Sequence, residues 1–213
     1  MTLEEYTSIY TPEDAVGWHC IDAHLATLYG ERKPRHYAPP LHFIAGGTDP
    51  LDGTSFYDHP GDPAHIHVVS YGLSALYYDE SAVGGLYSGL GFELTFRVVP
   101  EPGEEGDPTW VTGLMNNLAR YLHDSRRWFE PNEFIPGNGP IRLGRDTDIT
   151  GLAIAEDPEL GTITTPHGEV RFLQLVGLTT AEVEELQQDP TVGAVEDLLN
   201  AKRAVDPLLV TRL

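Results

Sequence analysis

The sequence predicts an α+β fold with a mixed, mainly antiparallel central sheet flanked by helices, and three observations support this prediction. Short stretches rich in β-branched and aromatic residues, such as 65–71 and 91–99, are typical of strands. Segments with helix start signals lie between and after them, in irregular alternation with the strands. An apolar fraction of 40% is sufficient for a buried core. We therefore expect residues 1–213 to form a single domain, with a helix and a proline-rich loop at 1–64 packed on the same core.

The first 64 residues predict one helix followed by a long loop. Thr11 can cap a helix whose first turn holds Pro12 and two acidic residues, and Gly30 can end that helix. Residues 31–64 are rich in Pro, Gly and Asp, so most of this stretch should be loop. The sequence "LHFIAGG" at 41–47 is its strand-like part.

The middle of the chain predicts two strands and a helix. The strands are expected at 65–71 and 91–99. Asp107 can cap a helix over 108–123, whose apolar face consists of residues at three- and four-residue spacings: Leu114, Leu118, Tyr121 and Leu122.

The last third predicts two more strands and two helices. The strands are "GLAIAEDP" (151–158) and "GEVRFLQLVGL" (168–178), and the second is apolar enough to be central in the sheet. Thr179 and Glu182 form a capping-box pattern that opens a helix. A last helix over 192–203 precedes "PLLVTRL", which is interpreted as a short final strand.

The segment "SGLGFELTFRVV" (88–99) has two chemically different faces. One face is apolar and should be core, with Phe92, Leu94 and Phe96. The other carries Glu93, Thr95 and Arg97, and two interpretations remain open. This polar face is presented to a binding partner, or Glu93 pairs with Arg97 or a neighbouring strand and only solvates the sheet. Catalysis by Glu93 is the least favoured, because the sequence identifies no second carboxylate to work with it.

Charge limits the classes of partner. Lys and Arg total 13 against 33 Asp and Glu, so the formal net charge is −20. Such a chain repels nucleic acid and anionic membranes and attracts basic proteins, so we expect a protein or peptide partner, possibly basic. The acidic N-terminus lacks a signal-peptide pattern, and no apolar run approaches the roughly 20 residues of a membrane span, so a cytoplasmic location is expected. The lone Cys20 is interpreted as a small buried thiol.

Catalytic motifs are not found. The sequence has no G-x-S-x-G, G-x-G-x-x-G or Walker A pattern. His65 and His67 share one face of a predicted strand, which is half of a metal site, and Asp58, His59 or Asp62 could supply a third ligand. The favoured interpretation is that both histidines are structural, so we predict no metal and no cofactor. The alternative is a metal-assisted hydrolase that uses His65, His67 and a nearby carboxylate.

Several longer segments, taken together and in order, resemble the N-terminal domain of the Suppressor of fused family. The resemblance covers nearly the whole chain and rests on "DPLDGTSFY" (49–57), "HIHVVSYGLSALY" (65–77), "SGLGFELTFRV" (88–98), "PTWVTGLMNNLARYL" (108–122), "EDPELGTITTPHGEVRFLQLVGLTTAEVEEL" (156–186) and "PLLVTRL" (207–213).

The resemblance implies a non-catalytic binding domain. In animals the family restrains transcription factors by holding a short peptide as an added strand in a groove between two domains, and related bacterial proteins are proposed to be immunity proteins. Tyr121 matches a tyrosine of the family's groove-lining helix, and Glu133 falls at the position of a groove aspartate. The second wall of the animal groove is not part of this sequence. We therefore predict a regulatory or toxin-immunity protein of bacterial type that sequesters a protein partner, with Tyr121 and Glu133 as partner-binding residues.

Overall fold

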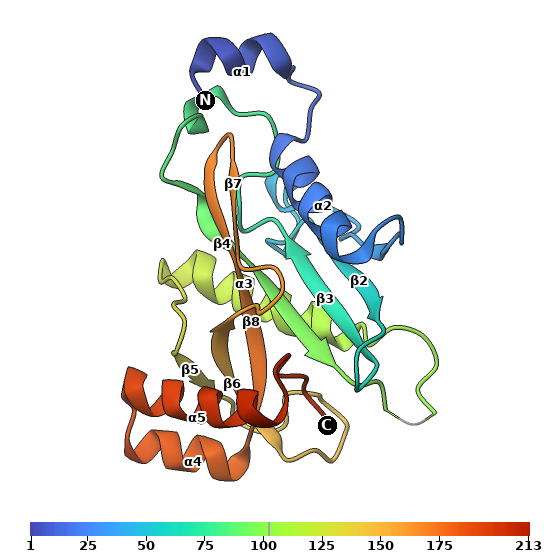
Figure 1. Cartoon of the computed structure of the whole chain (residues 1–213), viewed down its shortest axis with the longest axis vertical. Helices are drawn as coiled ribbons and strands as arrows, with labels where there is room; N and C mark the ends of the chain where they lie inside the picture. Colours follow the sequence, from blue (N-terminus) through green and yellow to red (C-terminus); the bar gives the residue numbers. More distant parts are fainter. Residues whose placement is uncertain (102) are drawn as a thin grey trace.

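One mixed sheet passes through the middle of the molecule in the computed structural model, which describes residues 1–101 and 103–213 (Figure 1). Its strands are β1 (Arg35–Tyr37), β2 (Gly53–His59), β3 (His65–Tyr71), β4 (Tyr87–Val98), β5 (Phe134–Pro136), β6 (Ile149–Glu156), β7 (Thr162–Thr165) and β8 (Gly168–Thr179). The described strands run in the order β1-β2-β3-β4-β8-β6-β5, and β7 pairs with β8. The β4–β8 pair is parallel and the other pairs are antiparallel, which confirms the predicted α+β class with a mainly antiparallel sheet.

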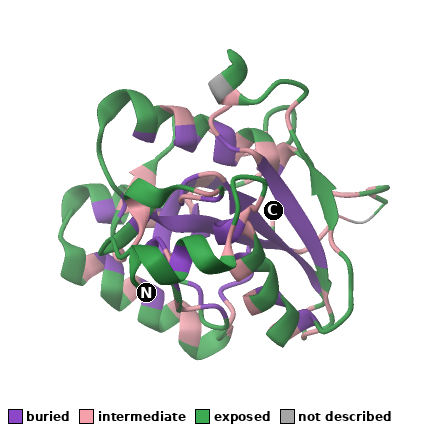
Figure 2. Ribbon diagram, turned by 90° about the horizontal axis from the view of Figure 1, so that it is seen from above, coloured by how far each residue is buried: buried purple, intermediate pink, exposed green. Residues whose placement is uncertain are grey.

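Helices cover both faces of this sheet. They are α1 (Leu3–Ile9), α2 (Val16–Tyr29), α3 (Trp110–Ser125), α4 (Thr180–Gln188) and α5 (Val192–Val205), with short 3₁₀ turns η1 (Phe43–Ala45) and η2 (Glu80–Ala82). The α3 helix packs on one face. On the other face, α2 covers the β2–β3 side and the pair α4 and α5 covers the β6–β8 side. Figure 2 shows the result, with buried strands inside and exposed helical surfaces outside.

The central strands are buried on both faces. The apolar face of β4 packs against α3 as predicted, and the predicted core residues are buried: Phe92, Leu94, Phe96, Phe172, Leu173 and Leu175. The polar face of β4 is not a surface, however. Glu93, Thr95 and Arg97 are each 0% exposed, so the expectations that this face meets a partner or solvates the sheet were wrong. The expectation that Glu93 pairs with a neighbouring strand is correct, because Ser70 of β3 donates to it.

The reason lies in what covers β4. This strand lies between the part of the sheet under α2 and the part under α4 and α5. Two loops that are distant in sequence close over it, one at 157–160 and one at 208–211. The predicted final strand "PLLVTRL" belongs to this cover and, among the described residues, forms one isolated bridge, Val98 to Thr211.

Two helices begin later than their sequence signals predict. Residues 11–14 form a turn, in which Thr11 donates to Asp14, and α2 starts at Val16. Its first turn is held instead by the Leu76 carbonyl, which accepts from Gly17 at 2.9 Å. Asp107 likewise caps no helix, because its carboxylate accepts from Arg35 Nε at 2.8 Å. Gly30 does end α2, with φ of 63°.

The segment 31–64 contains more structure than predicted. It supplies β1 and the buried strand β2, and "LHFIAGG" contains the turn η1 rather than a strand. The short helix α1 was also not predicted, although Thr2 and Glu5 form a capping box that marks its start. Tyr6 attaches α1 to the body of the protein through a 2.8 Å hydrogen bond between its hydroxyl and His167 Nε2.

Candidate functional site

A groove of about 650 Å³ brings together the two residues that the family resemblance selected. It is lined by Leu118, Tyr121, Arg127, Trp128, Phe129, Asn132, Glu133, Phe134, Ile135, Pro136, Pro190, Thr191, Val192 and Val195. These residues come from the second half of α3, the segment after it, β5 and the start of α5. Tyr121 and Glu133 therefore lie on one surface, although neither periodicity nor charge predicts this.

Exposed apolar side chains form much of the groove wall. Tyr121 is 45% exposed and does not pack beneath the sheet. Its ring stacks on the buried Phe129, with centroids 6.2 Å apart and planes 15° apart. Trp128 and Val192 are 55% and 59% exposed. Neither residue was predicted from the sequence, although a Trp-Phe pair directly after an amphipathic helix is a signal that could have identified Trp128.

Glu133 is held by a turn that is anchored to the sheet. Its Oε2 accepts from the Glu130 backbone N–H at 2.9 Å, which fixes the side chain at the groove rim. Asn132 adopts a left-handed φ of 67° and donates to the Ile154 carbonyl on β6 at 2.8 Å. The Glu133 residue is exposed, so its carboxylate can accept hydrogen bonds from a cation or from backbone N–H groups of a partner.

The groove also contains an outermost strand. Among the described residues β5 is the last strand on its side of the sheet. Gly137 donates to Thr150 of β6, and backbone direction alternates along a strand, so the polar backbone groups of Phe134 and Pro136 point away from β6. They comprise two carbonyls and one N–H, because proline has no N–H. Such an edge can pair with an added strand.

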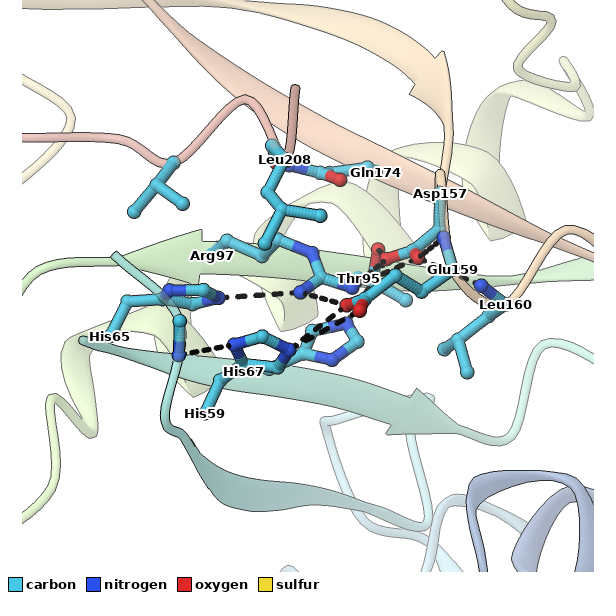
Figure 3. Close-up of polar contacts among 12 residues, drawn as sticks. His59, His65, His67, Thr95, Arg97, Asp157, Glu159, Leu160, Gln174 and Leu208 are labelled. Atoms are coloured by element: carbon cyan, nitrogen blue, oxygen red, sulfur yellow. Dashed lines mark hydrogen bonds and ion pairs between the residues drawn. The ribbon is translucent and has the colours of Figure 1, made fainter. Parts of the chain in front are cut away.

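A second polar cluster lies buried behind β4 (Figure 3). Its centre is the Asp157 carboxylate, which accepts from Thr95 Oγ1 at 2.9 Å and from His67 Nε2 and Arg97 at 3.0 Å each. The backbone N–H groups of residues 159 and 160 add two further bonds. Burial alone would raise the pKa of Asp157, but His67 and the Arg97 guanidinium hold it well below its usual range. Asp157 was not predicted from the sequence, because no local pattern distinguishes it from other acidic residues.

The two strand histidines belong to this cluster and use all their ring nitrogens within it. His65 Nδ1 lies 2.8 Å from the Pro63 carbonyl, so it must donate, and Nε2 then accepts from Arg97. His67 donates from Nε2 to Asp157 and accepts at Nδ1 from the Tyr29 hydroxyl at 2.7 Å. Burial lowers the pKa of both rings, that of His65 to about 4. Both histidines are therefore neutral hydrogen-bonding groups in the folded protein.

Two of the three residues considered as third metal ligands, Asp58 and His59, are engaged in other contacts. Asp58 pairs with Arg35, and His59 stacks on His65 and contacts Glu159 at 3.1 Å. Within 1–101 and 103–213, no group of three or more His, Cys, Asp or Glu side chains is placed to hold a metal ion.

Glu93 has a separate structural role. Its carboxylate accepts hydrogen bonds from the hydroxyls of Ser70 and Ser74, both at 2.6 Å, and from three consecutive backbone N–H groups at 72–74. Burial raises the pKa of Glu93, and these five donors oppose that shift by stabilising the carboxylate. Glu93 therefore organises the turn after β3, and it does not pair with Arg97.

Two smaller sequence expectations concern Cys20 and membrane spans. Cys20 is only half-buried, and burial raises the pKa of its thiol. Of the helices that the structure describes, none combines the length and apolarity needed to cross a membrane.

Comparison with known sequences identifies similarity to Suppressor of fused proteins. The family model described as Suppressor of fused protein (SUFU) matches residues 47–213. The Suppressor of fused homologs of Homo sapiens and Mus musculus are each 36% identical over 206 residues. Those alignments cover 92% of this chain and 42% of each relative, so the chain spans less than half the length of the curated relatives that it matches.

Comparison with solved structures gives the same fold. A chain of the Sufu–Fu complex superposes with a TM-score of 0.82 at 31% identity, covering 94% of this chain and 91% of that one. Drosophila Suppressor of Fused superposes at 0.80 with 30% identity, covering 95% of this chain and 51% of that one. A putative SUFU homolog from Neisseria gonorrhoeae shares the fold, with a TM-score of 0.59 at 15% identity over 89% of this chain and 90% of that chain.

Proposed function

This chain belongs to the Suppressor of fused family, and on that basis we propose that it is a non-catalytic module that sequesters a protein or peptide partner in the Tyr121–Glu133 groove. The proposal rests on one observation. The two residues that the family resemblance selected line a single groove, together with exposed apolar side chains and an outermost strand. A relative of known structure is a Sufu–Fu complex, so binding of a protein partner occurs within the family.

The groove suits an extended peptide. The outward backbone groups of β5 can form main-chain hydrogen bonds with an added strand, which supply affinity independently of sequence. Tyr121 and Trp128 offer large, partly exposed rings for apolar side chains of that strand. Glu133 at the rim can then select a partner residue that carries a donor or a positive charge.

The partner that fits the whole molecule is basic. A net charge of −20 attracts cationic proteins and accelerates their association. A bacterial regulatory role, or neutralisation of a basic toxin, is the biological setting that we propose for this chemistry. Association should then slow as salt is added, because exposed charges are screened within about 8 Å at physiological ionic strength.

The alternative, a metal-assisted hydrolase, has little support in the geometry. It required His65 and His67 to offer ring nitrogens to a metal or a substrate. All four nitrogens are hydrogen-bonded within the protein, and both residues are buried.

Affinity capture with charge-reversed baits tests the proposal. Wild-type chain, Glu133→Arg and Glu184→Arg would be used to capture proteins from the source cells, and captured proteins would then be titrated against each purified bait. Glu184 is exposed on α4 outside the groove, so its reversal makes the same change in net charge. A partner of this groove should bind Glu133→Arg at least tenfold more weakly, about 1.4 kcal/mol, and bind Glu184→Arg nearly as well as the wild type.

Folding must be monitored, because Glu133 also accepts a local backbone hydrogen bond. Glu133→Gln keeps an acceptor oxygen and removes only the charge, so it should melt close to the wild type and still bind more weakly. Equal affinity of wild type, Glu133→Arg and Glu133→Gln for the captured partner would show that the groove is not the binding site.

A further inference from the structure

A second, polar hollow of about 400 Å³ lies along α3. It is lined by Tyr37, Asp49, Thr109, Thr112, Gly113, Asn116, Asn117 and Arg120. Its lining includes a row at four-residue spacings, which runs from the N-cap Thr109 through Gly113 and Asn117 of α3. Tyr121 continues this row one turn further along α3, where it lines the first groove together with Leu118. The two hollows share none of their lining residues.

One residue that lines the hollow is an exposed glycine that packing does not require. Gly113 lies inside α3, where glycine is less favourable than alanine because it loses more backbone freedom on folding. A Cβ at this position would meet no atom within 4 Å. In contrast, a Cβ at Gly17 in α2 would lie 2.1 Å from the Ala75 carbonyl oxygen, so packing requires that glycine. Gly113 instead leaves the helix backbone open to close approach from outside.

A buried carboxamide lies one turn along the same hollow. Asn116 is 8% exposed, and its Oδ1 is buried without a hydrogen-bond partner among the residues that the structure describes. An unpaired buried carbonyl is unfavourable, and it can be satisfied by an N–H donor. Asn116 lines the hollow, so a donor that enters it approaches the carboxamide, whose nitrogen can donate to a carbonyl in return.

The charged groups around the hollow are already paired with each other. Arg120 contacts both Asp49 and Asn117. The Tyr37 hydroxyl donates to Asp107, which also accepts from Arg35. A ligand with a net charge would have to displace one of these partners, whereas a neutral group with one donor and one acceptor would not.

We propose that this hollow is a second binding site that takes the main chain of an uncharged, extended peptide segment, with a peptide unit paired to Asn116 over Gly113. A peptide unit has the N–H and C=O that a carboxamide can bind in pairs. Gly113 allows the approach of a backbone that a Cβ would obstruct.

NMR titration of the full chain tests this site with a defined probe. The probe is N-acetylglycine N-methylamide, which contains two uncharged peptide units, and acetate and methylammonium serve as charged controls. The backbone amide of Gly113 and the side-chain amide of Asn116 should shift with the probe and not with the controls. Gly113→Ala and Asn116→Leu should each lower the affinity for the probe at least fivefold. Glu133→Arg in the other groove should leave this affinity unchanged.

Melting temperatures distinguish a variant that has lost the binding site from one that has not folded. Both Gly113→Ala and Asn116→Leu should melt at or above the wild-type temperature, because the first adds a better helix former and the second removes an unpaired polar atom. If Asn116→Leu does not fold, the affinity of Gly113→Ala for the probe tests the proposal by itself. Absence of shifts in the wild type, equal shifts with acetate, or full probe affinity in Gly113→Ala would each overturn the proposal. None of these results depends on the function proposed for the Tyr121–Glu133 groove.

Discussion

Among single residues, Asp157 shows how a carboxylate can be stable while fully buried. Five donors surround it, and two of them, Arg97 and His67, come from strands that lie 60 and 90 residues earlier in the chain. Arg97 is also 0% exposed and has a second acid, Glu159, at 2.7 Å. Removal of Asp157 would leave the buried Arg97 with only the partly exposed Glu159 as a counter-charge, and it would take the acceptor from the other donors.

Asp157→Ala should therefore lower the free energy of unfolding by about 3–5 kcal/mol. The double variant Arg97→Met/Asp157→Leu should lose less than the single variant, because it removes both charges and replaces them with apolar groups. Urea denaturation of the two variants and the wild type measures both changes. A single variant that is as stable as the wild type would contradict the view that Asp157 balances the Arg97 charge.

His65 should make stability depend on pH. Its pKa is about 4 in the folded protein, against an ordinary value of 6.5, because burial disfavours the charged ring. Above pH 6.5 the ring is neutral in both the folded and the unfolded state, and its contribution to the free energy of unfolding is then complete. As pH falls from 6.5 to 4, the unfolded chain binds a proton that the folded chain excludes, so the free energy of unfolding falls by roughly 3 kcal/mol.

Unfolding curves of the wild type and His65→Gln between pH 4 and 7 would isolate this effect. Other groups titrate equally in both proteins, so the difference between the two curves reports His65. The variant should lose less stability than the wild type over this range. Parallel curves would mean that His65 keeps an ordinary pKa in the folded protein.

Among the elements, α4 shows a local signal that the structure uses as the sequence suggests. Thr179 Oγ1 accepts from the Glu182 N–H at 3.3 Å, and Glu182 Oε2 accepts from the Thr179 N–H at 2.8 Å. The two bonds satisfy donors that the first turn of a helix leaves open. Glu182 also contacts Lys202 at 2.6 Å, which connects α4 to α5.

Thr179→Ala should lower the free energy of unfolding by about 1 kcal/mol, because the Glu182 N–H loses its acceptor. Glu184→Ala, an exposed change on the same helix, should stay within about 0.5 kcal/mol of the wild type. The midpoints of urea unfolding give both values, provided that the slopes match. Equal loss in the two variants would show that the cap is not a stabilising contact.

For the whole molecule, the parallel β4–β8 pair joins two halves of the sheet. Strands β1 to β4 form one side, and β8, β6 and β5 form the other. The buried polar cluster crosses this junction, because His67 and Arg97 belong to the first half and Asp157 and Glu159 follow β6 in the second. α2 also bridges the halves through contacts of its cluster with Tyr57 and Phe172.

These bridges predict that residues 1–213 unfold as one domain, in a single cooperative transition. Trp18 reports on α2, and Trp110 and Trp128 report on the region around α3. Tryptophan fluorescence and far-UV circular dichroism should give coincident urea curves. Two separated transitions would mean that the N-terminal segment and the rest of the sheet are independent units.

The sequence by itself determined the features that depend on near neighbours in the chain. The glycine at the end of α2, the capping box of α4 and the strand at 65–71 each occur where local patterns predicted them. The alternation in β4 also identified which side chains share a face. These features depend on backbone geometry and hydrogen bonds over a few residues, which a short sequence window contains.

Only the tertiary structure decided what covers each face. Alternation separates Glu93, Thr95 and Arg97 from the apolar face, but it cannot show that distant loops close over them. The start of α2 depends in the same way on the Leu76 carbonyl. The groove requires α3, β5 and α5 to meet, so spacing alone could not predict that Tyr121 and Glu133 share it. In each case the deciding contact joins residues far apart in the chain, and its energy is available only after the fold has formed.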